Sequence, residues 1–179
     1  CRWLFLGSMI PLYLIALYNY PADDDFALTL PAATAWVNTG SLWAPLQAVV
    51  QKTVETYQSW QGDFVSTAFF GLCPMVFDID LYFISSWFIL TLLWVSVGYL
   101  VKGVTHHYLK AERSVFLITY AAVMVLVLQF MPSIGYSVFW HNGGQYTVAA
   151  CTLMLTVGLL LRCNAPMTRG RSLFRGGML

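Results

Sequence analysis

The chain has 179 residues, of which 59% are hydrophobic, 16% aromatic and 9% charged. Soluble domains carry about a quarter charged residues, so this composition excludes a soluble globular protein and indicates an integral membrane protein. The formal net charge of +1 gives no reason to expect nucleic-acid binding, and the four scattered cysteines indicate neither a zinc site nor a disulfide framework.

The first apolar run covers residues 3–18 and contains Pro11. As a helix it would extend about 24 Å, slightly less than the roughly 30 Å of a bilayer core. It lacks an obvious small-residue cleavage site, so we expect a membrane span and not a signal peptide. Because the chain begins with Cys1 and not with methionine, we also expect it to be truncated at its N-terminus.

A long polar segment, 19–61, follows this span. Residues 26–38 predict a helix that is interrupted at Pro31, and Gly40 predicts its end. Ser41 can cap a second helix that continues to about residue 60.

The second helix of this segment is amphipathic. Its apolar positions recur at helical spacing at Leu42, Leu46, Val49, Val50, Thr53, Val54, Tyr57 and Trp60, and glutamines and Glu55 take the other side. Such a helix either lies in the bilayer interface or packs against the rest of the protein. The sequence leaves both alternatives open.

The remaining elements are apolar runs joined by short polar connections. The stretch 62–77 is short, whereas 81–101, 114–131 and 145–161 each predict a span, and 162–179 is a basic tail. If 62–77 does not cross the membrane, eight of the nine Lys and Arg residues lie on one side, with Lys52 alone opposite. Cytoplasmic loops carry the excess of Lys and Arg, so 62–77 is expected to be re-entrant or to lie on the outer face.

We therefore predict an all-α fold, a single polytopic membrane helical bundle of about four transmembrane helices with juxtamembrane helices on its outer face over 19–80. We expect the protein to lie in the cytoplasmic membrane, with its N-terminus and its basic tail in the cytoplasm. Seven of the eight acidic residues then lie on the outer face. Acidic residues contribute little to topology, so this clustering suggests a functional use of carboxylates.

Three adjacent carboxylates, Asp23, Asp24 and Asp25, form the first candidate site. Their mutual repulsion favours a raised pKa for one of them, which would suit it to act as a base. Alternatively, one caps the helix that starts near Phe26 and the others are solvated. A divalent cation held by the carboxylate oxygens is a third alternative.

Two further clusters combine aromatic rings with polar groups on the predicted outer face. The first comprises Tyr57, Trp60, Gln61 and Asp63, and the second Trp140, His141, Asn142 and Tyr146. Aromatic planes beside amides and carboxylates suit sugar rings, although an interfacial aromatic belt and a structural role for the single His141 are the alternatives.

Three patches of the sequence together resemble one family. They are the Asn-x-Pro-x-Asp-Asp-Asp-Phe opening at 19–26, Tyr-Gln-Ser-Trp-Gln-Gly at 57–62, and Phe-Trp-His-Asn-Gly-Gly-Gln-Tyr-Thr at 139–147. They resemble an uncharacterised group of bacterial multi-pass membrane proteins, classed as a domain of unknown function, which is similar to type C glycosyltransferases. The resemblance covers nearly the whole chain and corresponds to the N-terminal portion of such an enzyme.

The resemblance implies transfer of a sugar from a polyprenyl-phosphate carrier to an acceptor on the outer face of the membrane. One of Asp23, Asp24 and Asp25 would deprotonate the acceptor hydroxyl, and Trp60, Gln61, Trp140, Asn142 and Tyr146 would line the sugar pocket. The departing phosphate needs cationic stabilisation, for which this face offers Lys52 and a protonated His141. A metal at the aspartates, or cations in missing C-terminal sequence, are the alternatives.

A second class of function stays open, a non-catalytic polysaccharide-export, transport or scaffolding subunit that binds sugar without breaking bonds. A transporter is expected to carry polar or broken-helix features near the middle of the membrane. The predicted spans 81–101, 114–131 and 145–161 contain no charged residue, which favours the enzyme. The oligomeric state, the sugar and the acceptor are not indicated by the sequence.

Overall fold

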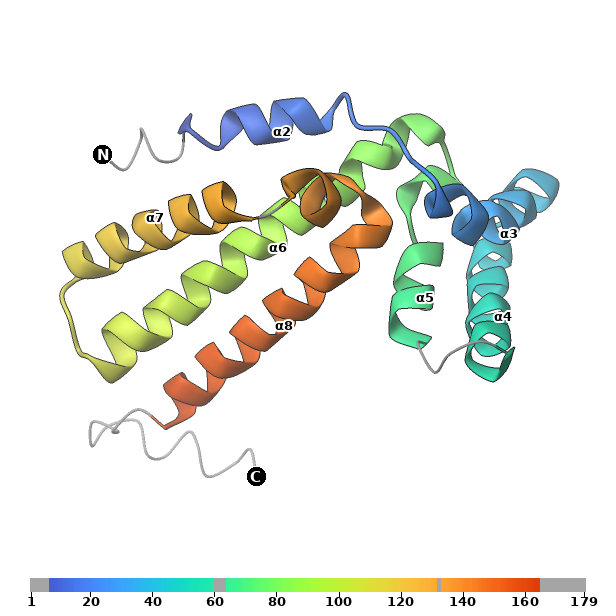
Figure 1. Ribbon diagram of the computed structural model, residues 1–179. Coiled ribbons are helices and arrows are strands. Elements are labelled where there is room, and N and C mark those ends of the chain that lie inside the picture. Colours follow the sequence, from blue (N-terminus) through green and yellow to red (C-terminus); the bar gives the residue numbers. More distant parts are fainter. Residues whose placement is uncertain (1–6, 60–63, 132, 165–179) are drawn as a thin grey trace.

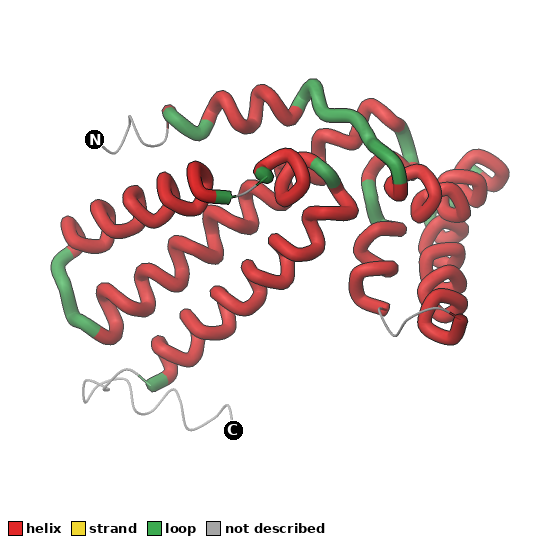
Figure 2. Tube along the Cα trace, in the orientation of Figure 1, coloured by secondary structure: helices red, strands yellow, loops and turns green. Residues whose placement is uncertain are grey.

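The computed structural model describes residues 7–59, 64–131 and 133–164, and within them the chain forms helices and no strand (Figure 2). The α-helices, in chain order, are α2 (Ile10–Ala16), α3 (Asp24–Thr39), α4 (Trp43–Ser59), α5 (Phe64–Gly71), α6 (Phe83–Lys102), α7 (Arg113–Phe130) and α8 (His141–Cys163) (Figure 1). Short 3₁₀ turns η1 (Pro74–Val76) and η2 (Ile79–Tyr82) precede α6, and π-helical turns η3 (Gly103–Tyr108) and η4 (Gly135–Phe139) follow α6 and α7. The predicted all-α class is confirmed.

Three helices within the described residues are long and apolar enough to cross a membrane: the continuous helical stretch Ile79–Tyr108, α7 and α8. They coincide with the predicted spans 81–101, 114–131 and 145–161, so the chain is a multi-pass membrane protein. The first predicted span, 3–18, lies partly outside the described residues. Its described part contains α2, where Pro11 occupies the first turn and therefore interrupts no hydrogen bond of the helix.

Helix α6 is the centre of the bundle, with α7 on one side of it and α8 on the other, and α2 runs along its N-terminal half (Figure 1). Leu93, Val97, Met124 and Cys151 form the buried core between α6, α7 and α8. Two glycines allow η3, which continues α6, to approach α8, because a Cβ on Gly103 would lie 3.3 Å from the Gly158 carbonyl oxygen. Small residues of this kind are typical of helix contacts within membranes.

Hydroxyl groups inside the spans donate to carbonyl oxygens one turn earlier in the same helix. Ser96 donates to Leu92 and Thr105 to Val101 in the α6 stretch, and Thr152 donates to Val148 in α8. No water is available in the bilayer core to satisfy such groups, so these internal bonds let serine and threonine occupy lipid-exposed helices.

Helices α3, α4 and α5 pack together beyond one end of the bundle, around a small core of Ala32, Val49 and Val76 (Figure 1). The eight residues of α5 span about 12 Å, far less than a bilayer core. The expectation that 62–77 does not cross the membrane stays a prediction, and residues 62 and 63 lie outside the described residues.

The interruption expected at Pro31 does not occur, because α3 runs unbroken from Asp24 to Thr39. Proline removes the N–H that would bond to the carbonyl four residues earlier, that of Ala27. Both Pro31 and Ala27 are exposed, so this carbonyl can bond to solvent instead. The expected end at Gly40 is confirmed, since Gly40 adopts the left-handed conformation with φ 63°.

Candidate functional site

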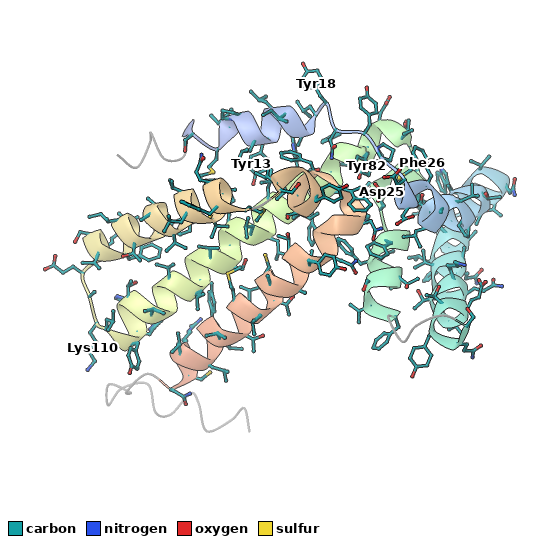
Figure 3. All side chains as sticks on the ribbon, viewed as in Figure 1. Tyr13, Tyr18, Asp25, Phe26, Tyr82 and Lys110 are labelled. Carbon is teal, nitrogen blue, oxygen red and sulfur yellow. The ribbon has the colours of Figure 1, made fainter. Side chains whose placement is uncertain are left out.

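Asp25 is a buried carboxylate, 2% exposed, at the junction of α3, α6 and α8 (Figure 3). The Tyr82 hydroxyl donates to its Oδ2 at 2.5 Å, and the backbone N–H of Ala22 donates to the same oxygen at 3.2 Å. The backbone N–H of Asn142 donates to Oδ1 at 3.1 Å. A buried carboxylate that accepts three hydrogen bonds holds together the segments that supply the donors.

The carboxylate of Asp25, far away in the sequence, accepts a hydrogen bond from the backbone of the first turn of α8. Trp140, which precedes α8, makes no capping hydrogen bond with its side chain, whereas Asp25 accepts from the N–H of Asn142 and Asp24 accepts from the Asn142 amide at 3.1 Å. The N-terminus of a helix favours nearby negative charge. The N–H of His141 is satisfied in turn by the Tyr82 hydroxyl at 2.9 Å.

Two side-chain bonds join the polar segment after α2 to the chain that precedes α8. The Trp140 indole donates to the Ala22 carbonyl at 3.3 Å, and the Asn19 amide donates to the Phe139 carbonyl and to Ser86 Oγ, the latter at 2.8 Å. The predicted aspartate cluster and the predicted 140–146 cluster therefore meet, and Asn19 and Ser86 belong to the same junction.

A hollow of about 380 Å³ opens between these two segments, and we call it the Asp23 hollow. Its polar side chains are Asn19, Asp23 and Ser133, and its aromatic rings are Tyr20, Tyr136, Phe139 and Trp140. The Tyr136 and Trp140 rings meet edge to face, 5.1 Å apart. The hollow therefore combines one carboxylate with flat apolar rings, the pairing of groups that suits a hydroxyl-bearing ring.

The three aspartates occupy different environments. Asp25 is buried, Asp24 is exposed and bonded to Asn142, and Asp23 is exposed and lines the hollow. Asp23 also adopts a positive φ of 44°, a conformation that a non-glycine residue rarely adopts and that is enriched at functional sites. Asp23 is the one of the three aspartates that lines the hollow.

His141 is 4% exposed and does not line the hollow. Its ring stacks on Phe69 with the centroids 4.5 Å apart, and its Nε2 donates to the Phe69 carbonyl at 3.2 Å, because a carbonyl oxygen can only accept. Its Nδ1 has no hydrogen-bond partner among the described residues. His141 thus fastens α5 to the start of α8.

The remaining predicted site residues that the structure describes on α4 and within α8 do not line the hollow. Lys52 pairs with Glu55 on α4 at 3.3 Å, and Tyr57 packs edge to face on Phe64. The C-terminal end of α4, which carries Tyr57, lies at the far end of the α3–α5 unit from Asp25 (Figures 1 and 3). Tyr146 is 75% exposed on α8 and is not part of the lining. Trp60, Gln61 and Asp63 lie outside the described residues.

A divalent cation at the aspartates receives no support from the geometry. Within the described residues no group of three or more His, Cys, Asp and Glu side chains could hold a metal ion. Both oxygens of Asp25 already accept hydrogen bonds from groups of the protein.

Sequence reasoning missed Tyr82, Tyr20 and Tyr136 as members of the site. Tyr82 and Asp25 are 57 positions apart, and no local pattern around Tyr82 sets it apart from other aromatic residues of a span. Tyr136 lies in the π-helical turn η4, just before the cluster predicted from Trp140 onward. An aromatic residue four positions before Trp140 was the one feature of the sequence that could have indicated it. Comparison with protein-family models, with curated proteins and with solved structures finds no match.

Proposed function

We propose that the protein binds a lipid-linked sugar at its outer end and that Asp23 is the base in transfer of this sugar to an acceptor hydroxyl. The observation that carries the proposal is the Asp23 hollow, which an exposed aspartate and four aromatic residues line together at the end of a membrane bundle. Sugars offer apolar ring faces and a rim of hydroxyls, which match these two kinds of group.

In the proposed reaction the Asp23 carboxylate takes the proton of the acceptor hydroxyl as the oxygen attacks the first carbon of the sugar. The bond between that carbon and the phosphate oxygen breaks, and the polyprenyl phosphate leaves with the electron pair. A base at this position contributes roughly 10²–10⁴-fold to the rate. The cation that stabilises the leaving phosphate is not among the described residues that line the hollow.

The neighbouring aspartates have supporting roles in this proposal. Asp25 positions the hollow, because it holds the segment with Ala22 against the start of α8. Asp24 holds the Asn142 side chain. The proposed location is the outer face of the cytoplasmic membrane. The excess of Lys and Arg at the other end of the bundle supports this orientation, because cytoplasmic loops are rich in these residues.

The test uses the full-length protein in membrane vesicles, with radiolabelled undecaprenyl-phosphate hexoses as donors and the lipid and polysaccharide fractions of the vesicles as acceptors. We expect Asp23→Asn to lower transfer by roughly 100-fold or more, as expected for loss of a general base. Asp80→Asn is the matched control, because Asp80 is an exposed acid on η2 that does not line the hollow. Transfer that survives Asp23→Asn would refute the role of Asp23.

A non-catalytic sugar-binding subunit is the second candidate, and the absence of a cationic side chain from the described lining favours it. It predicts binding of the undecaprenyl-phosphate hexoses with no transfer by the unmodified protein. In that case Trp140→Ala weakens binding, whereas Asp23→Asn, which keeps a polar group of the same shape, weakens it less.

A further inference from the structure

The end of the bundle opposite the Asp23 hollow carries a patch of exposed cations, which we call the basic end. It is formed where the helical stretch Ile79–Tyr108 finishes, α7 begins and α8 finishes (Figure 1). Glu112 is the one acidic residue at this end within the described residues. Four positive charges against one negative charge leave a net charge of +3 on the described part of the basic end, and the exposed cations are Lys102, Lys110, Arg113 and Arg162.

The backbone between α6 and α7 is held in place by hydrogen bonds. Through the π-helical turn η3, the N–H of Leu109 donates to the Val104 carbonyl at 2.9 Å, and the N–H of Ala111 donates to the Thr105 carbonyl at 2.8 Å. The Thr105 hydroxyl donates to the Val101 carbonyl at 2.7 Å. A ligand at the basic end therefore meets a backbone that is already ordered, which lowers the entropy cost of binding.

The turn η3 also brings cations from two helices together. A Cβ on Gly103 would lie 3.3 Å from the Gly158 carbonyl oxygen and 3.5 Å from the Leu161 Cβ. Gly103 directly follows Lys102, and Leu161 directly precedes Arg162, so these two cations start from neighbouring points of the backbone. Figure 3 shows Lys110 at the outer edge of the same end.

Apolar side chains beside the cations fit a membrane surface. Tyr108 and Leu109 are 70% and 60% exposed, directly before Lys110. Tyrosine is enriched at membrane–water interfaces, and an exposed leucine is stabilised when hydrocarbon covers it. The helices that meet at this end are long and apolar enough to cross a membrane. Lipid headgroups are therefore the charged groups that these cations would meet first.

The lysines of the two ends differ in what their charges face. Lys52, on α4, pairs with Glu55 at 3.3 Å. Lys102 and Lys110 form no such pair with another described residue, and Glu112 accepts a hydrogen bond from the Ser114 hydroxyl at 3.4 Å. The positive charge of the basic end is thus left for anions from outside the described chain.

We propose that the basic end binds the phosphate groups of anionic phospholipids in the membrane leaflet that it faces. Clusters of four to eight Lys and Arg residues next to a span are typical of binding to anionic lipids, and the sequence continues with further cations that lie outside the described residues, at Arg169, Arg171 and Arg175. Tyr108 and Leu109 favour a lipid over soluble phosphate, because a lipid can cover apolar side chains as well as pair with the cations. The inference is independent of the proposed sugar transfer.

Native mass spectrometry of the full-length protein in detergent micelles tests the proposal. Phosphatidylglycerol or phosphatidylcholine with the same acyl chains is added, individual bound lipids are resolved, and the Kd of the first bound lipid is obtained for each. We expect phosphatidylglycerol to bind at least about fivefold more tightly. This preference should shrink as the salt concentration rises, because salt screens exposed charges. Equal Kd values for the two lipids would overturn the proposal.

Lys110→Gln and Lys52→Gln remove the same charge from opposite ends of the protein. We expect Lys110→Gln to weaken phosphatidylglycerol binding about fivefold, equivalent to about 1 kcal/mol for one cation near an anionic surface, and to leave phosphatidylcholine binding unchanged. Lys110 is exposed, so the fold should tolerate the change. Lys52→Gln, and Lys110→Arg, which keeps the charge, should bind phosphatidylglycerol as the unmodified protein does.

The other outcomes contradict the proposal. An equal loss in Lys52→Gln would place the lipid elsewhere, and an equal loss in Lys110→Arg would show that the charge is not what binds. Inorganic phosphate provides the last comparison. If it displaces phosphatidylglycerol more than chloride of the same ionic strength does, the basic end is a site for soluble phosphate and the assignment to lipid is wrong.

Discussion

Asp25 accepts hydrogen bonds from three segments that are far apart in the sequence, through Ala22, Tyr82 and Asn142. The first is the polar segment after α2, the second precedes α6, and the third begins α8. Asp25 therefore connects all three segments, and its loss leaves one buried and two part-buried donors without this acceptor.

We expect Asp25→Ala to lower the free energy of unfolding by about 3 kcal/mol, because it removes the acceptor of the buried Tyr82 hydroxyl and of two part-buried backbone N–H groups, and a buried donor left unsatisfied costs about 1–3 kcal/mol. Thermal unfolding in detergent, followed by circular dichroism, measures the fall in Tm. Asp24→Ala is the control, since Asp24 is exposed and makes one bond to the Asn142 side chain, and its cost should stay near 1 kcal/mol. Equal losses for the two variants would contradict the structural role of Asp25.

Tyr82→Phe tests the same junction from the other side. It removes the hydroxyl that donates to Asp25 and accepts from the His141 N–H. Since contacting residues are not additive, the double variant with Asp25→Ala should cost less than the sum of the two single variants.

The buried thiol of Cys73 should make the stability of the protein fall at high pH. Burial raises the pKa of its thiol to about 11 from the ordinary 9.0, while the hydrogen bond with Ser85 acts in the opposite direction. Between pH 9 and 11 the unfolded thiol loses its proton and the folded one keeps it, so the unfolded state binds fewer protons and stability falls as pH rises. Below pH 9 the thiol makes no pH-dependent contribution.

Unfolding of the unmodified protein and of Cys73→Ala, measured between pH 8 and 11, checks this expectation. The unmodified protein should lose more stability over this interval than the variant. Alkylation with N-ethylmaleimide at pH 8 provides a second readout, with rapid modification of the exposed Cys163 and slow modification of the buried Cys73. Equal alkylation rates at the two cysteines would contradict the burial of Cys73.

At the scale of the elements, hydropathy and charge were sufficient to predict the long helices but not their contacts. The three spans follow from apolar length alone, and Gly40 ends α3 because it tolerates a left-handed conformation. The effect of Pro31 depended on whether the Ala27 carbonyl reaches solvent, which is a tertiary property. The bonds of Asp25 to Tyr82 and Asn142 likewise join residues 57 and 117 positions apart, so local patterns do not reveal them.

The amphipathic pattern of α4 left open whether its apolar face lies in the bilayer interface or packs against the protein, and the structure shows packing for part of that face. Val49 is buried in the small core with Ala32, but the neighbouring apolar stripe is exposed at Trp43, Leu46, Val50, Val54 and Tyr57. Packing within the chain therefore covers one edge of the apolar face. The bilayer interface is the surface that would cover the rest.

We expect spin labels on α4 to report two different media. Labels at Val50 and Val54 should be relaxed more by oxygen, which concentrates in lipid, and labels at the adjacent Gln51 and Glu55 more by a water-soluble nickel complex. All four positions are exposed on the same helix, so each pair controls for local mobility. Equal access of the nickel complex to all four labels would place the stripe in water and refute an interfacial helix.

The whole molecule is polarised by charge along the bundle. Lys102, Lys110, Arg113 and Arg162 lie at the end where α6 and α8 finish and α7 begins. Asp23, Asp24, Asp25, Asp78 and Asp80 lie at the other end, where α6 and α8 begin. Figure 3 shows Asp25 and Lys110 at these opposite ends. Because the excess of Lys and Arg stays in the cytoplasm, the Asp23 hollow should face outward.

Single cysteines at Asp80 and Lys110, in a background with the native cysteines replaced by alanine, test this orientation in intact cells. We expect a membrane-impermeant maleimide to label Asp80→Cys in intact cells, and to label Lys110→Cys only after the cells are permeabilised. Both positions are exposed, so a difference in labelling reports the side of the membrane and not burial. Labelling of Lys110→Cys before permeabilisation would indicate the opposite orientation, and the proposed donor would then be a lipid-linked sugar on the cytoplasmic face.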